Sequence, residues 1–313
     1  MNDVPQWAWI GFASTLFVLL AIDLYSHRGA HQRTRRADVK WSILWISVGL
    51  GFSIFVWHLM GGDAAQEYLA AYLIEESLSL DNLFVFLLIF KTLQIPLENQ
   101  RRALLWGIFG ALVFRGIFIF LGVAAMERWD WITYLFGALL FFAAWRALRE
   151  PQEEVVENQL VNWLASRLPV SRDRNSSHLL VRENGKLLIT PLLVAIIGLE
   201  LSDILFAIDS VPAALSVTRR EFLVYSSNAF AILGLRSLYV VMVASLERVS
   251  YLHYGLAAVL AFAGFKLVTH DHLHVPPLLS VGIIAAILVV TIVISLHIAP
   301  NGRRSDKAPA DDA

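Results

Sequence analysis

Cysteine is absent from this sequence of 313 residues, and charged residues are scarce. The missing thiols exclude disulfides, thiolate metal sites and thiol redox chemistry by the chain itself. Asp, Glu, Lys and Arg make up 16% of the residues, whereas a soluble domain carries about 25%. Hydrophobic residues make up 57%, and the mean hydropathy is +0.61. Lipid rather than water is therefore expected to surround most of the fold.

Long apolar runs recur along the chain and predict an all-α polytopic membrane protein with nine transmembrane helices. Each run can cross a hydrocarbon layer of about 30 Å at about 1.5 Å per residue. The predicted spans cover residues 7–25, 41–60, 68–90, 103–126, 131–148, 188–213, 222–246, 253–270 and 278–298. The first run follows Asp3 rather than a basic segment, which indicates a retained helix and not a cleaved signal peptide. Gly198 and Pro212 leave open a broken or re-entrant sixth span.

Basic residues gather on one side of the predicted membrane. The loops after the first, third and fifth spans and the C-terminal tail carry most of the Lys and Arg, whereas the alternate loops carry few. Because basic loops stay in the cytoplasm, the N-terminus is expected outside and the C-terminus inside. The loop after the fifth span, 150–187, is the only sizeable soluble segment, and Asn184-Gly185 predicts a small hairpin within it.

Two sets of three spans resemble each other at a nearly constant offset. The separation of Asp81 from Asp203 matches that of Arg115 from Arg236 to within one residue. The third to fifth spans are therefore predicted to repeat, inverted, as the sixth to eighth, with a substrate site where the copies meet at mid-membrane. The predicted parts are two N-terminal spans (1–67), the first repeat half (68–149), the cytoplasmic loop (150–187), the second repeat half (188–272), a last span (273–300) and a disordered tail (301–313).

The third and sixth spans carry acids where charge is unfavourable. Each charge at the bilayer centre costs about 2.5–3.5 kcal/mol on insertion scales, so these acids must be paired, hydrated, protonated or bound to an ion. Only two arginines are expected as counter-charges within spans, which leaves a surplus of acid. The acids are Glu75, Glu76, Asp81, Glu200, Asp203 and Asp209.

Helical spacing places several of these acids beside polar side chains. Glu75, Ser79 and Asn82 share one helix face, and Glu200, Asp203 and Ser210 share another. Carboxylate, amide and hydroxyl oxygens are hard ligands that suit Mg²⁺, Ca²⁺ or Mn²⁺. A cation path is the favoured interpretation, and helix packing alone or a proton relay are the alternatives. Residues predicted to support or gate such a path are Glu76, Ser79, Arg115, Ser202, Ser210, Asn228, Arg236 and Asp23.

Residues 75–86, 200–213 and 227–236 resemble the three signatures of the TerC/Alx family of membrane proteins, and the loop 181–186 matches as well. The resemblance covers nearly the whole chain, and the residues around Asp23 favour the Alx branch. It implies a nine-span protein of the bacterial inner membrane, akin to the LysE transporter superfamily, that exports manganese. The metal ligands that it implies in this chain are Glu75, Asp81, Asn82, Glu200, Asp203 and Asp209.

The expected function is therefore transport of a divalent cation and not enzymatic catalysis. Mn²⁺ is the expected substrate, exchange for protons is an option, and no organic cofactor is expected. Expected partners are the cation and the bilayer, but no nucleic acid. A homo-oligomer and handover of the metal to an exported metalloenzyme are further options. The His-rich loop 270–274 is a candidate site for that handover. The family also carries two other labels: a membrane-bound redox modulator, and a stress-response scaffold for tellurite resistance. Carboxylates repel the tellurite oxyanion, and a redox protein without cysteine would need a bound cofactor.

Overall fold

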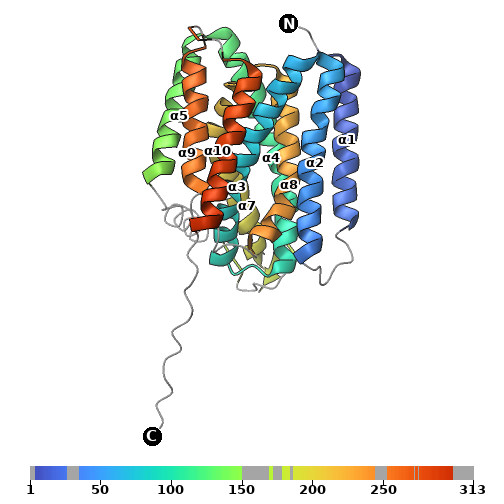
Figure 1. Cartoon of the computed structure of the whole chain (residues 1–313). Helices are drawn as coiled ribbons and strands as arrows, with labels where there is room; N and C mark the ends of the chain where they lie inside the picture. The colour runs from blue at the N-terminus through green and yellow to red at the C-terminus, as the bar shows by residue number, and fades with distance from the viewer. Residues whose placement is uncertain are drawn as a thin grey trace.

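Helices dominate the computed structural model (Figure 1). It describes residues 4–26, 35–149, 169–171, 178–183, 186–243, 252–270, 272–273 and 275–298. Within these ranges the chain forms nine helices and one two-stranded sheet. The helices are α1 (Gln6–Ser26), α2 (Arg35–Met60), α3 (Gly62–Thr92), α4 (Leu97–Arg128), α5 (Trp131–Arg149), α7 (Pro191–Leu215), α8 (Glu221–Val243), α9 (Leu252–Val268) and α10 (Pro277–Ile298).

The predicted spans fall on these helices in order, but several helices are longer than the apolar runs. α3 and α4 begin about two turns before the predicted boundaries, because polar turns beyond the hydrocarbon still satisfy their backbone within a helix. Six of the described helices are long and apolar enough to cross a membrane, and α8 and α9 contribute shorter apolar stretches. The chain is thus an all-α polytopic membrane protein, and the count of nine spans stays a prediction.

A hairpin precedes α7, as the sequence predicts. β1 (Leu180–Glu183) and β2 (Lys186–Ile189) pair antiparallel, with Val181 opposite Leu188; the turn at 184–185 lies outside the described residues. Residues 188–189, which the prediction assigned to the sixth span, belong to β2 instead. Pairing with β1 satisfies their backbone groups in an extended form, so the helix begins later than the apolar run.

α7 is one continuous helix, so the break that Gly198 and Pro212 left open in the sixth span is not formed. It begins at Pro191, a residue suited to the first turn because its missing N–H needs no partner there. The side chain of Thr190 caps this end, since its Oγ accepts a hydrogen bond from Leu193 N at 3.3 Å. The helix then passes through Gly198 and Pro212 without interruption.

Four helices occupy the centre of the molecule. α3 packs against α7 and α8, and α4 packs against the same two helices. Figure 1 shows α1 and α2 on one side of this centre, and α5, α9 and α10 on the other. Each helix of α3–α5 meets its expected counterpart in α7–α9, which is the pattern that a two-fold axis would generate. The inverted repeat itself stays a prediction, but the acid-bearing helices α3 and α7 lie side by side.

Small residues allow the helices to approach closely. A Cβ atom on Gly264 of α9 would lie 3.3 Å from the Gly137 carbonyl oxygen of α5, so these helices pack almost backbone to backbone. Gly61 has φ 91° between α2 and α3, a conformation that favours glycine. Large apolar side chains such as Phe17 and Leu121 remain exposed, as expected for a surface that faces lipid.

Candidate cation site

Arg115 on α4 is completely buried between the two acid-bearing helices. Its Nη1 donates to Glu75 Oε2 on α3 at 2.7 Å. Its Nη2 donates to Asp203 Oδ1 on α7 at 2.9 Å, and its Nε contacts both oxygens of the same carboxylate at 3.2 Å. One guanidinium therefore joins carboxylates from two helices, with charge-assisted hydrogen bonds on both sides.

The polar face that helical spacing predicts on α3 is buried in the structure. Glu75 and Ser79 are 0% exposed and Asn82 is 1% exposed. In the amide orientation that satisfies both of its groups, Asn82 accepts a hydrogen bond from Arg115 Nη2 at 2.9 Å and donates to the Leu78 carbonyl at 3.1 Å. Asn228 on α8 is also buried and lies beside Glu75. Arg115 of α4 thus meets Glu75 and Asn82 of α3, and Glu75 in turn lies beside Asn228 of α8.

The matching face of α7 carries Asp203 and Ser210, and both are buried, as is the neighbouring Ser202. Glu200 lies one turn before Asp203, and the two acids act on each other electrostatically. Its carboxylate lies against the backbone of α4 at Gly110, where any Cβ atom would overlap it. Asp209 is partly buried, and its charge acts on Arg115. The face predicted from spacing is therefore formed, and it extends along several turns of α7.

Several buried polar atoms on these faces have no hydrogen-bond partner among the residues that the structure describes. They are Ser79 Oγ, Glu200 Oε2 and Ser210 Oγ. More than about 90% of buried polar groups are paired in folded proteins. Unpaired carboxylate and hydroxyl oxygens therefore mark places where a ligand, an ion or water can bind, and they are the ligand atoms that a hard cation prefers.

Glu76 belongs to a different neighbourhood. It lies beside Tyr68 and Tyr72, whose rings stack with centroids 6.2 Å apart. The Tyr68 hydroxyl donates to the Gly49 carbonyl of α2 at 2.8 Å. Glu76 is not among the partners of Arg115, so its predicted supporting role would have to act through the contact between α2 and α3.

Other predicted residues are not brought to Arg115. The side chains of Asp81 and Arg236 lie outside the described part of the structure. Asp23 is buried near the end of α1, and the side-chain hydrogen bonds of Arg115 go to Glu75 and Asp203. His270 and His272 are exposed, and Asp271 and His274 are outside the described residues. Within the described ranges, no three His, Asp or Glu side chains form a group that could hold a metal ion.

The contact between Glu200 and Gly110 is a feature that the sequence does not predict. The available signal was a small residue within a membrane helix, which commonly marks a helix–helix interface, but the signal does not say which side chain lies against it. Gly107, one turn earlier on α4, has the same signal and would meet only Leu199, at 3.6 Å from its Cβ. Only the packing of α4 against α7 shows that the two glycines differ in what they contact.

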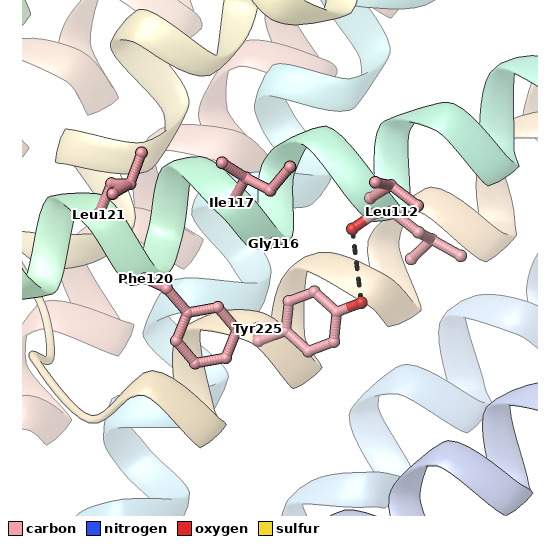
Figure 2. Close-up of a pocket in the computed structure, with 7 residues that line it drawn as sticks. Leu112, Gly116, Ile117, Phe120, Leu121 and Tyr225 are labelled. Carbon is pink, nitrogen blue, oxygen red and sulfur yellow. Dashed lines mark hydrogen bonds between the residues drawn. The ribbon is translucent and has the colours of Figure 1, made fainter.

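An apolar hollow lies between α4 and α8 (Figure 2). Its lining is Leu112, Val113, Gly116, Ile117, Phe120, Leu121 and Tyr225. The Tyr225 hydroxyl donates to the Leu112 carbonyl at 3.4 Å, and no charged side chain is part of this lining. Such a surface suits hydrocarbon and not a cation, so the acids around Arg115 remain the candidate site.

Comparison with known proteins relates this chain to integral membrane proteins. The family model described as the integral membrane protein TerC family matches residues 60–303. The uncharacterized membrane protein STKORF319 of Myxococcus xanthus is 41% identical over 308 residues, covering 97% of this chain and 95% of its own. A protein of Escherichia coli strain K12, provisionally named membrane-bound redox modulator Alx, is 40% identical over 299 residues, covering 92% of this chain and 93% of its own.

A more distant relative, an uncharacterized membrane protein of Rickettsia bellii, is 32% identical over 292 residues, covering 92% of this chain and 97% of its own. No solved structure matches the chain. The three signatures, two of which carry acids, lie inside the segment that the family model matches. The chain therefore belongs to the TerC family of integral membrane proteins.

Proposed function

We propose that this protein transports a hard divalent cation across the bacterial inner membrane, and that its substrate is Mn²⁺, which it exports. The observation that carries the proposal is the buried group of Glu75, Arg115 and Asp203 at the crossing of α3, α4 and α7. Ionisable residues at membrane depth are costly and commonly mark ion pathways. The unpaired oxygens on the same faces supply further hard ligands.

The roles follow from this placement. Glu75, Asn82, Glu200, Asp203 and Asp209, with Asp81, are proposed to ligate the cation as it passes between α3 and α7. Arg115 orients the carboxylates, and Asn228 and the buried serines complete the polar faces. The distribution of basic loops supports a cytoplasmic C-terminus, and with that orientation export would run from the side of the hairpin to the opposite side. Coupling to protons through the same acids remains part of the proposal.

The test is the manganese content of manganese-loaded cells that carry wild-type protein, Asp81→Asn or Asp203→Asn at matched membrane expression. Wild-type protein should lower the content, and neither amide variant should, because an amide lacks the charge that binds the ion. Asp130→Asn is the matched control, since Asp130 is exposed at the turn between α4 and α5. Equal export by both variants and wild type would show that these acids serve helix packing, and the transport assignment would lose its residues.

The name of the Escherichia coli relative makes a membrane-bound redox modulator the second candidate. This chain has no cysteine, so electrons would have to be carried by a bound haem, flavin or metal centre. The absorbance spectrum of the purified protein distinguishes the two candidates. A stoichiometric haem or flavin band would favour the redox role, whereas manganese efflux by protein without such a band would favour transport.

A further inference from the structure

The guanidinium of Arg115 occupies the space between Glu75 and Asp203. We propose that Arg115 is a tethered cation, which fills this carboxylate pair whenever no metal is bound and must leave it before both acids can hold a divalent ion. The inference rests on the proposed function, because only a transporter has an empty state. In that state the protein would supply its own positive charge. Its consequence is that the protein can return empty across its transport cycle.

The contact geometry makes the two occupants exclusive. Arg115 reaches Glu75 Oε2 at 2.7 Å on one side and Asp203 Oδ1 at 2.9 Å on the other. A Mn²⁺, Mg²⁺ or Ca²⁺ ion that both carboxylates ligate must lie within about 2.0–2.6 Å of an oxygen from each. That position falls between the two carboxylates, where the guanidinium now lies. Metal binding by the pair therefore requires Arg115 to move.

Charge explains why the pair has a built-in occupant. Two ionised carboxylates that face each other in a low-dielectric interior repel strongly, and an uncompensated buried charge is strongly destabilising. Arg115 is the one buried arginine among the side chains that the structure describes. It supplies one positive charge to the empty pair, and a divalent ion that replaces it supplies two. A monovalent ion would only exchange one positive charge for another, so the exchange favours divalent cations.

The displaced guanidinium has another acid to face. Arginine stays charged in proteins, so it cannot be released into an apolar space. The charge of Asp209, further along α7, already acts on Arg115. Asn82 also accepts a hydrogen bond from Nη2 at 2.9 Å in its satisfied amide orientation, and this neutral contact can persist while the carboxylates are released.

The proposal separates two transport modes. Net transport requires the empty protein to reorient, whereas exchange of internal for external metal uses only the loaded form. Without Arg115 the empty form would carry two carboxylates with no built-in counter-charge through its conformational change, but the loaded form would stay neutralised by the metal. A variant without this charge should therefore keep exchange and lose net transport, which a general loss of folding or binding would not produce.

The experiment uses full-length protein in liposomes of phosphatidylethanolamine and phosphatidylglycerol, with radioactive Mn²⁺ outside. Uptake is measured into metal-free vesicles and into vesicles preloaded with unlabelled Mn²⁺. Wild-type protein and the control Arg128→Gln, which alters an arginine near the Trp129 ring, should show both modes. Arg115→Met should lose net uptake about tenfold or more relative to exchange.

Loss of both modes by the same factor in Arg115→Met, or retention of both, would overturn the inference. If wild-type protein shows neither mode, the proposed function fails instead, and the two failures are thus distinguishable. Should Arg115→Met not fold, Arg115→Lys answers the question through its apparent KM for Mn²⁺ in exchange. Lysine lacks the planar fork and competes less well, so the apparent KM should fall; an unchanged or higher value would contradict a tethered competitor.

Discussion

Arg115 of α4 contacts Asp203 of α7 with two nitrogen atoms, Nη2 at 2.9 Å and Nε at 3.2 Å. The arginine is completely buried and the aspartate is 3% exposed, so both charges have been removed from water and from lipid headgroups. Each charge is tolerated because the other is present. The pair therefore fixes how α4 and α7 lie against each other, in addition to any part it has in transport.

Removal of one partner should destabilise the fold more than removal of both. Arg115→Met leaves the carboxylates of Glu75 and Asp203 buried without a counter-charge, and breaking a buried pair costs about 3–5 kcal/mol. The double variant Arg115→Met, Asp203→Asn should recover a large part of this loss, because the second change removes one of the uncompensated charges. The free energy of unfolding in mixed micelles is the measurement.

Arg128→Gln serves as the control for these two variants, because Arg128 lies at the end of α4 and is exposed. Its effect should be within about 0.5 kcal/mol, as for most surface substitutions. Equal losses in Arg115→Met and in the double variant would mean that the charges of Arg115 and Asp203 do not depend on each other for stability.

Gly110→Ala should displace Glu200. An added Cβ would overlap the Glu200 carboxylate, which must move away. Because this carboxylate is the end of a flexible side chain, the cost should be at the low end for overpacking, about 1 kcal/mol. Gly107→Ala is the matched control, since its Cβ would stay 3.6 Å from the Leu199 side chain, which is ordinary contact. The measurements are thermal unfolding of the purified protein and manganese efflux, and Gly110→Ala should lower both while Gly107→Ala changes neither appreciably.

Shortening the acid provides a rescue for the same contact. In Gly110→Ala, Glu200→Asp the carboxylate withdraws from α4 by one methylene, and stability should return towards that of wild-type protein. Failure of the shorter acid to restore stability would mean that the methyl group acts on the backbone approach of α4 to α7 and not on Glu200.

The sequence predicted which helix faces are polar but not which side chains meet across them. Helical spacing alone places Glu75, Ser79 and Asn82 on one face, and the structure buries all three. The choice of Glu75 and Asp203 as the partners of Arg115 depends on the rotation and height of three helices relative to one another. Those quantities arise from packing between distant segments, and no local pattern encodes them.

The start of α7 shows a second limit of local patterns. Residues 188–189 are apolar and adjoin a long apolar helix, so they satisfy the pattern of a helix and of a buried strand equally well. Pairing of β2 with β1 decides between these forms. Asn184-Gly185 predicts a hairpin over residues 179–188, and the second strand ends one residue later, at Ile189, because strand ends depend on how far the ladder continues.

Lys266 of α9 and Ser280 of α10 should respond unequally to substitution. The lysine is 7% exposed, and its Nζ donates to Ser280 Oγ at 2.8 Å. Ser280→Ala removes the acceptor and leaves the buried ammonium without this hydrogen bond, which should cost about 1–3 kcal/mol. Lys266→Met removes the charge but keeps an unbranched chain of similar length, and Ser280 can still donate to the Pro276 carbonyl, now at 3.4 Å.

Lys266→Met should therefore be less harmful than Ser280→Ala, and adding Ser280→Ala to Lys266→Met should cost little more. Glu67, whose charge acts on Lys266, keeps the Thr218 hydroxyl at 2.7 Å as a partner after the change. Unfolding free energies of the two single variants and the double variant provide the measurement. Thr15→Ala, on the exposed face of α1, is the control for loss of a hydroxyl. If Lys266→Met costs as much as Ser280→Ala, the ammonium must have a stabilising partner beyond Ser280, and Glu67 would be the first residue to test.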